Sequence, residues 1–229
     1  MRRTSGTAAF DAGVRAALTM IPVTILTAVL PGAAMAEDCR DRIAALFEDG
    51  GALDPFSRPP HSYVATTYDA GGAVKWIYQA RYETALRMIG GTEGGNRILM
   101  IGPDTWTGPS PEGPWTAAPN QNPPDMEAFF RAHMAASVKN LDRTDCAGVV
   151  EIDGLRLVKF TYVTRTDPAP EAGGAWFGAL YTAYIDPDTG RLMRQDTAES
   201  VAHYASEPST DLQVTLYTYD PTITIPTPE

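Results

Sequence analysis

Residues 74–82 read VKWIYQARY, and the order of side chains in this stretch indicates the class of the fold. Apolar and aromatic residues occupy every second position: Val74, Trp76, Tyr78, Ala80 and Tyr82. The positions between them are mostly polar. A period of two is typical of an antiparallel strand with one face on a core and one face in solvent. The stretch therefore predicts a half-buried antiparallel strand with an aromatic inner face.

The same alternation recurs along most of the chain. Further strands are expected at 62–68, 83–90, 97–102, 148–152, 155–165, 175–186, 191–200 and 212–220. Turn residues separate several of them, at 90–96, 153–154 and 186–190. Strands outnumber helices, and no strand–helix–strand alternation occurs. The sequence therefore predicts a mainly β fold with few helices (α+β), built on one long, curved antiparallel sheet.

Two helices are expected beside this sheet. The first covers 37–48, and its apolar residues recur at helical spacing on one face: Cys39, Ile43, Leu46 and Phe47. The second covers 126–139, and its apolar side carries Met126, Phe129, Phe130, His133, Met134 and Val138. Residues 49–60 are rich in Gly and Pro and are expected to form a loop.

Residues 1–36 have the layout of a secretory signal peptide. A basic start precedes sixteen uncharged, mostly apolar residues that end at Pro31, and a small-x-small AMA site follows. Because roughly 20 residues are needed to cross a bilayer, cleavage is favoured over an uncleaved anchor helix. Asp38 before Cys39 argues against a lipid-modified cysteine. Residues 37–229 are expected to form a single soluble periplasmic domain without stable membrane insertion.

Cys39 and Cys146 are the two cysteines of the chain. An even pair in an oxidising compartment usually closes, so we expect a disulfide between them. Their spacing fits no metal site or redox motif.

The balance of charged side chains limits the classes of partner that are expected to bind. The chain has 18 basic and 28 acidic side chains, a formal net charge of −10, and no basic stripe. Nucleic acid is therefore not an expected partner, because phosphate binding needs clustered Lys or Arg. The acidic surface also disfavours adsorption onto anionic lipid heads.

No catalytic motif is present in the sequence. The three histidines, His61, His133 and His203, have no nucleophile or carboxylate at a recognisable catalytic spacing. Nucleophile-elbow, zinc-protease, dinucleotide and P-loop motifs are missing. Residues 186–190 read DPDTG, which a β-turn explains better than a calcium loop. We expect no catalytic residue, no metal and no cofactor, and His133 is more readily a packed histidine than a base.

Aromatic residues gather on the expected inner face of the sheet. Ordinary core packing is one explanation, and in 175–186 both faces are apolar. A concave sheet whose inner face is only partly filled, leaving a pocket for an apolar ligand, is the other. The candidate cavity-lining residues are Trp76, Tyr78, Phe129, Phe130, Met134, Trp176 and Tyr184.

Several short motifs carry a family resemblance. They are ILMIG (98–102), TW (105–106), GPW (113–115), YID with TGRL (184–192) and YTYD (217–220). In these the chain resembles the LolA/LolB/RseB-like superfamily of periplasmic lipoprotein carriers and their relatives. The resemblance covers most of residues 40–225. It implies an incomplete barrel, lidded by helices, around a hydrophobic cavity, and a place in outer-membrane biogenesis.

These observations lead to one leading hypothesis and two alternatives. The leading one is an exported, non-catalytic periplasmic protein that binds an apolar ligand, such as an acyl chain or a lipidated protein. The first alternative is an envelope interaction or sensor module of the same fold, which would present an exposed apolar patch. The second is a small-substrate enzyme, which would need polar groups that converge in a cleft.

Overall fold

The computed structural model describes residues 32–119, 122–169 and 173–228, and the first 31 residues of the expected signal segment lie outside this range. The elements are α1 (Gly32–Ala45), β1 (His61–Tyr68), β2 (Val74–Thr84), β3 (Arg87–Thr92), β4 (Arg97–Ile101), β5 (Asp104–Gly108), β6 (Thr116–Ala117), α2 (Met126–Lys139), β7 (Asp142–Ile152), β8 (Leu155–Arg165), β9 (Phe177–Ile185), β10 (Leu192–Ala202) and β11 (Leu212–Tyr219). Within the described residues, neither helix is long and apolar enough to cross a membrane.

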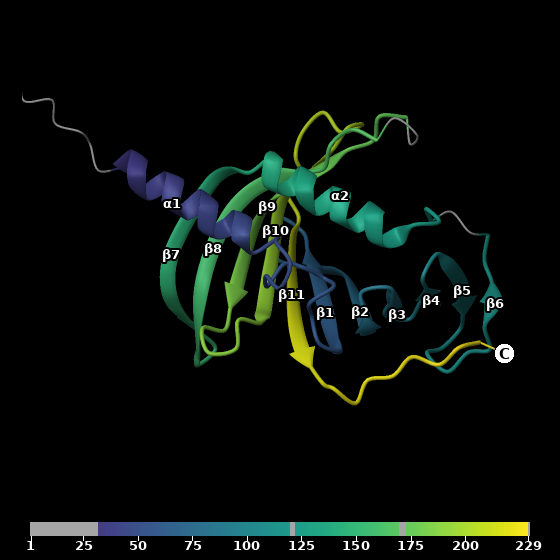
Figure 1. Cartoon of the computed structure of the whole chain (residues 1–229). Helices are drawn as coiled ribbons and strands as arrows, with labels where there is room; N and C mark the ends of the chain where they lie inside the picture. The colour runs from purple at the N-terminus through teal and green to yellow at the C-terminus, as the bar shows by residue number, and fades with distance from the viewer. Residues whose placement is uncertain (1–31, 120–121, 170–172, 229) are drawn as a thin grey trace, which may run out of the picture. The chain divides into compact units, whose positions relative to one another are not determined.

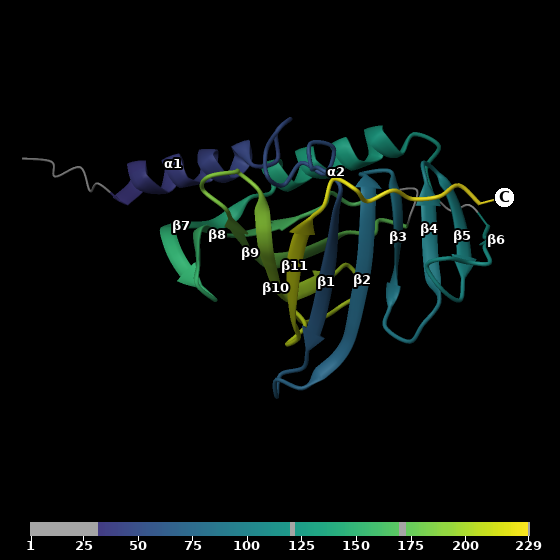
Figure 2. The ribbon, with the colours of Figure 1, turned by 90° about the horizontal axis from the view of Figure 1, so that it is seen from below.

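All the strands join one antiparallel sheet. Their order is β6-β5-β4-β3-β2-β1-β11-β10-β9-β8-β7, so the first and last strands pair in the middle and β6 and β7 form the two edges. Helices α1 and α2 lie on the same face of the curved sheet, as both views show (Figures 1 and 2). The expected mainly β fold, an incomplete barrel lidded by helices, is confirmed.

Helix α1 is held to the sheet by its apolar face and by the disulfide. Cys39 is bonded to Cys146 of β7 across a sequence separation of 107 residues, as expected. Ile43 is fully buried against Phe160 and its neighbours, and Phe47 packs beside it. The helix ends at Ala45, three residues earlier than the pattern predicted, and turns carry the chain onward.

The hairpin of β2 and β3 differs from the prediction of a strand at 83–90. Strand β2 continues to Thr84, a tight turn follows, and β3 begins at Arg87. The turn residues are Ala85 and Leu86, with the Thr84 side-chain oxygen 3.3 Å from the Leu86 amide. Neither residue is a usual turn former, and this explains why no turn was expected there.

Two β-bulges place side chains in a left-handed backbone conformation. In β7, Arg143 has φ 45° where two residues oppose one on β8; in β10, Glu199 has φ 50° in the same situation opposite β9. This conformation costs a residue with a side chain about 1–2 kcal/mol, and bulges of this kind usually carry glycine. Arg143 and Glu199 form an ion pair at 2.9 Å, both more than 40% exposed. Such an exposed pair contributes about 0–1 kcal/mol, so it does not offset the strain of two residues.

The chain beyond β11 packs along the other end of the sheet. Residues 220–228 run past β1 towards β5 (Figure 1). Ile225 is buried, and it forms a small core with Ile89 and Leu99, against which Trp106 and Trp115 also pack. The tail is therefore part of the folded structure.

Candidate functional site

The helix-covered face of the sheet carries a groove whose first half lies under α2. This hollow has a volume of about 460 Å³ and lies between α2, the loop that follows α1, and strands β8 to β10. Its lining is largely apolar: Phe47, Leu53, Pro55, Phe130, Met134 and Tyr162, with Arg58, His133, Ser137, Thr164, Tyr181 and Gln195.

The second half of the groove lies beside the first and is more polar. Its volume is about 520 Å³, and it shares Tyr181 and Gln195 with the hollow under α2. Strands β1, β2, β3, β10 and β11 supply the remaining lining: Tyr63, Ala65, Trp76, Tyr78, Thr92, Thr197, Gln213, Thr215 and Tyr217. Alternation explains this set, because paired residues such as Tyr63 and Tyr217 point to one face of the sheet.

The tyrosines of the groove are packed into a continuous cluster. The ring of Tyr63 lies 5.6 to 6.1 Å from the rings of Tyr78, Tyr82 and Tyr217. Burial raises the pKa of Tyr63, of Tyr82 and of Tyr217 above the ordinary value. Their hydroxyl groups therefore stay protonated at neutral pH and offer neutral hydrogen-bonding groups.

Among the described residues that line the two hollows, Arg58 is the one Lys or Arg. Its Nε donates to the Ala52 carbonyl oxygen at 3.2 Å, and one Nη donates to the Leu53 carbonyl oxygen at 3.4 Å. Its guanidinium group also lies 5.5 Å from the centre of the Tyr217 ring. The cation thus holds the loop above the groove, and the groove itself is almost uncharged.

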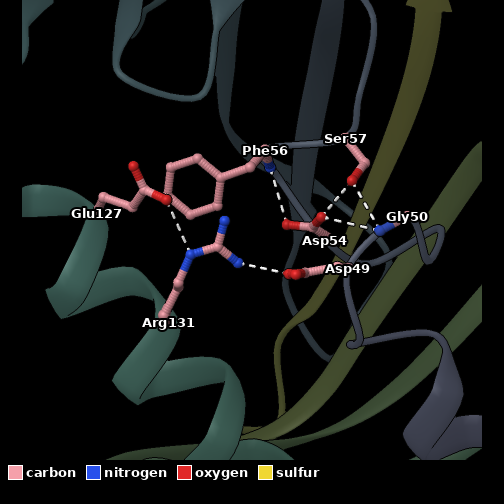
Figure 3. Close-up of polar contacts among 7 residues, drawn as sticks. All are labelled: Asp49, Gly50, Asp54, Phe56, Ser57, Glu127 and Arg131. Carbon is pink, nitrogen blue, oxygen red and sulfur yellow. Dashed lines mark hydrogen bonds and ion pairs between the residues drawn. The ribbon is translucent and has the colours of Figure 1, made fainter.

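A polar latch joins α2 to the loop that follows α1 (Figure 3). Arg131 of α2 donates to Asp49 of the loop at 2.6 Å and to Glu127 of its own helix at 2.9 Å. Its guanidinium group lies 4.7 Å from the centre of the Phe56 ring, and Phe56 packs edge-on against Phe130. The latch places Phe130 over the groove.

Asp54 organises the loop side of this latch. It is buried, and its carboxylate accepts hydrogen bonds from the Ser57 hydroxyl and from the Phe56 and Gly50 amides (Figure 3). Burial alone would raise the pKa of Asp54, but these hydrogen bonds outweigh it, so the pKa lies below its ordinary value. The ionised form is therefore the one that the fold stabilises.

The loop is expected to lose stability in acid because of Asp54. A carboxyl whose pKa is lowered on folding stabilises the protein above its unfolded pKa of about 3.8, and this contribution is lost as the pH falls further. Below about pH 4, the urea midpoint of the parent should fall more steeply than that of Asp54→Asn. Urea titrations of both proteins between pH 7 and pH 3 measure this. Parallel pH profiles would contradict the role given to Asp54.

The structure brings four of the seven expected cavity residues into the groove. Trp76 and Tyr78 line the open half, and Phe130 and Met134 line the half under α2. Phe129 is placed differently: its ring contacts His133 at a tilt of 50°, with centres 4.1 Å apart, and it lines neither hollow.

Trp176 and Tyr184 line neither hollow of the groove. Tyr184 is one residue from Ala183 of the core, so it points to the opposite face of β9. There its hydroxyl donates to Asp196 at 3.3 Å, under the guanidinium group of Arg194. Trp176 lines a separate hollow. Residues 175–186 are apolar on both faces, and the groove uses the face of Tyr181.

The sequence analysis missed Tyr63, Tyr181, Gln195, Gln213 and Tyr217. The alternation in 62–68 is a signal that could have placed Tyr63 beside the inner face of the neighbouring strand. The two glutamines had no such signal, because polar residues in a strand usually indicate the solvent side.

The histidines are engaged in packing. The Nδ1 of His133 lies 2.9 Å from the Phe129 carbonyl oxygen of its own helix. His61 is buried and stacked on Tyr82, with its Nδ1 2.9 Å from the Pro59 carbonyl oxygen. Burial lowers the pKa of His61, so it is neutral at pH 7. Within the described residues, neither ring forms an ion pair with a carboxylate.

Comparisons with known proteins return distant likenesses in fold. No protein-family model matches the chain, and no curated protein matches its sequence. Among solved structures, the chain is similar to the lipoprotein LppX of Mycobacterium tuberculosis (12% identity, 83% of this chain and 99% of that chain, TM-score 0.48). LprF from Mycobacterium bovis matches at 13% identity, 84% of this chain, 97% of that chain and TM-score 0.45. A LolA superfamily protein from Nitrosomonas europaea matches at 12% identity, 77% and 90% coverage and TM-score 0.32.

One of the matched structures is a LolA superfamily protein, the superfamily that the sequence motifs resemble. The identities and TM-scores are too low to carry a ligand or a partner from those proteins to this chain.

Proposed function

We propose that the groove binds an amphipathic molecule, with an apolar chain under α2 and an uncharged polar part in the open half. The observation that carries this proposal is the change of lining along one groove. Phe47, Phe130 and Met134 supply an apolar surface at one end, whereas Thr197 and Gln213 supply hydrogen-bonding groups at the other. Ligand pockets typically combine an apolar wall with a few placed polar groups.

The nearly uncharged lining of the groove limits which polar group the ligand can carry. An anionic head would need a free cation, but Arg58 is already bonded to the carbonyl oxygens of Ala52 and Leu53. Burying an unpaired charge in such a site is costly. A hydroxyl-bearing head is therefore favoured over a phosphate. This makes the apolar ligand expected from the sequence, such as an acyl chain or a lipidated protein, more specific.

A matched pair of variants on α2 tests the site under the lid. Phe130→Ala removes a ring from the wall of the groove, and Phe129→Ala removes the same ring from the adjacent position outside it. Losing part of a buried aromatic contact costs about 1–2 kcal/mol, so Phe130→Ala should weaken binding of a monoacylglycerol roughly tenfold. Phe129→Ala should leave the affinity within about twofold. Fluorescence displacement or calorimetry measures both.

Lipids that share one acyl chain but differ in the polar head group test which head group the groove binds. A monoacylglycerol should bind more tightly than a lysophosphatidylglycerol to the parent protein. Equal weakening by Phe129→Ala and Phe130→Ala, or no binding of either lipid, would contradict the proposal.

The proposed function also includes export of the protein to the periplasm. Signal cleavage after Ala36 would leave the part of α1 that carries Cys39 and Ile43, which is the part attached to the sheet. A periplasmic location also suits a disulfide, because thiols stay reduced in the cytosol. Native mass spectrometry of protein from the periplasm tests this: the mass should begin at Glu37 and lack the two cysteine hydrogens.

An interaction module is the second candidate, and an exposed apolar stripe favours it. On the face of the sheet away from the groove, Val64 lies opposite Leu216 in the register, at 41% and 52% exposure, and Leu212 is also exposed. Exposed apolar patches often mark protein contacts. Leu216→Lys should abolish capture of a specific periplasmic partner and leave lipid binding unchanged.

A further inference from the structure

A third hollow lies at β7 to β10, and of its lining residues only Thr164 also lines the groove. Its volume is about 460 Å³, and its apolar lining includes Val163, Leu180, Val201 and Trp176. Val163 and Leu180 are paired in the register directly after the pair of Tyr162 and Tyr181. Because successive residues of a strand point to opposite faces, these two lie on the face of the sheet away from the groove.

Two strained residues form the rim of this hollow. Arg143 and Glu199 both line it, and both have the left-handed conformation that a glycine would adopt without strain. Their exposed ion pair spans from β7 to β10, over the two strands between them. The ion pair stabilises the fold by less free energy than the two left-handed backbone conformations cost. Strain that the local contacts do not repay is a signature of a functional site.

The floor of the hollow is kept open by a glycine. A Cβ atom at Gly178 would lie 2.7 Å from the Cβ of Arg165, its register partner on β8. The guanidinium group of Arg165 is instead turned to the Trp176 ring, 5.3 Å from its centre. The apolar side chains of the floor remain half-buried, as a contact surface for a small ligand would be.

The charges around the hollow are balanced. Among the lining residues described, two are basic and two are acidic: Arg143 and Arg165, Asp142 and Glu199. This balance stands out in a chain with a formal net charge of −10. A ligand with a single charge would replace one member of this exposed ion pair and leave the other to solvent, so it would gain less than a ligand that pairs with both.

We infer that this hollow binds a zwitterion that carries an apolar group. The anionic group of the ligand pairs with Arg143, its ammonium group pairs with Glu199, and its apolar group lies on Val163 and Leu180. Each side chain exchanges one partner for another of the same charge, so no charge is left unpaired. In the absence of a ligand the two side chains satisfy each other. Apolar α-amino acids and the heads of zwitterionic phospholipids share this chemistry.

Calorimetric titration of the purified chain tests the ligand class. The probes are L-leucine and dihexanoylphosphatidylethanolamine, with hexanoate and hexylamine as singly charged counterparts. At least one zwitterion should bind more tightly than both counterparts, by up to about fivefold. Binding of L-leucine alone identifies a free amino acid as the source, and binding of the phospholipid alone identifies a lipid head. If neither zwitterion binds at millimolar concentration, or hexanoate binds equally well, the inference is wrong.

Glycine variants separate binding from folding. Arg143→Gly and Glu199→Gly each remove a charged side chain and relieve backbone strain. Each should weaken binding of the zwitterion by up to about fivefold without lowering the unfolding midpoint. Asp153→Gly is the matched control, since Asp153 is the third left-handed residue with a side chain but lies outside the hollow. It should leave binding unchanged. Unaltered affinity in both rim variants would overturn the assignment.

The inference does not depend on the function proposed for the groove. Phe130 lines the groove and does not line this hollow. Phe130→Ala should therefore weaken the acyl ligand and leave the zwitterion unaffected, and Arg143→Gly should do the reverse. The two sites can fail or succeed separately in these measurements.

Discussion

Replacing both cysteines, Cys39→Ser with Cys146→Ser, should lower the free energy of unfolding by about 4–5 kcal/mol. The bond closes a loop with a sequence separation of 107 residues, and in the chain-entropy model the contribution of a crosslink grows with the length of the loop. Urea titration of the variant and of the oxidised parent measures the difference.

Loss of the disulfide should disturb the groove as well as lower the stability of the whole protein. Beside Cys39, the Arg40 side chain donates to the carbonyl oxygens of Val138 and Leu141, at and just beyond the end of α2. A cation at the C-terminal end of a helix satisfies its free carbonyl groups and its dipole. When the disulfide is absent, α1 is held less firmly, and the lid helix loses part of this support.

Two controls identify the crosslink as the cause. The reduced parent should unfold at a urea concentration close to that of the double serine variant, because both lack the crosslink. Arg40→Ala in the oxidised protein should weaken the acyl ligand while losing far less stability than the double variant. A double variant within about 1 kcal/mol of the oxidised parent would contradict the chain-entropy estimate.

The sheet could be predicted because it follows from local alternation. In β2, one face carries Tyr78, Ala80 and Tyr82, and the structure pairs those residues with the inner faces of β1 and β3. Such a pattern needs no knowledge of the rest of the chain. The disulfide could also be predicted from the sequence, since two cysteines, Cys39 and Cys146, allow only one pairing.

The site could be predicted only in part, because several of its contacts join distant residues. Arg131 and Asp49 are 82 residues apart, and neither position has a pattern that marks it as half of a latch. Strand β9 shows the other limit: Tyr181 and Tyr184 lie on opposite faces of an apolar strand. Only the packing of α1 and α2 decides which face becomes the groove.

The bulges at Arg143 and Glu199 were not accessible from the sequence for a different reason. A left-handed position is usually signalled by Gly or Asn, and here it carries long charged side chains. Sequences depart from such local rules chiefly at functional or strained sites. The failure of the rule at these two positions is therefore informative in itself.

Replacing Ile225, in the tail beyond β11, with alanine should lower the free energy of unfolding by about 2–4 kcal/mol. Ile225 is 3% exposed and fills the core made with Ile89 and Leu99. Its backbone is also bonded on both sides: the amide donates to Glu83 at 2.7 Å, and the carbonyl oxygen accepts from the Nε of Arg87 at 2.8 Å. A thermal midpoint lower by roughly 5–10 °C is expected for a protein of this size.

The neighbouring residue supplies the control for this prediction. The Thr224 side chain is exposed, so Thr224→Ala should leave the midpoint within about 2 °C of the parent. The two outcomes distinguish a tail that closes a core from one that only trails along the surface. If Ile225→Ala melts with the parent, the apolar core at β3 to β5 is complete without the tail. If it melts early and Thr224→Ala does not, residues 220–228 belong to the fold as firmly as the strands on which they pack.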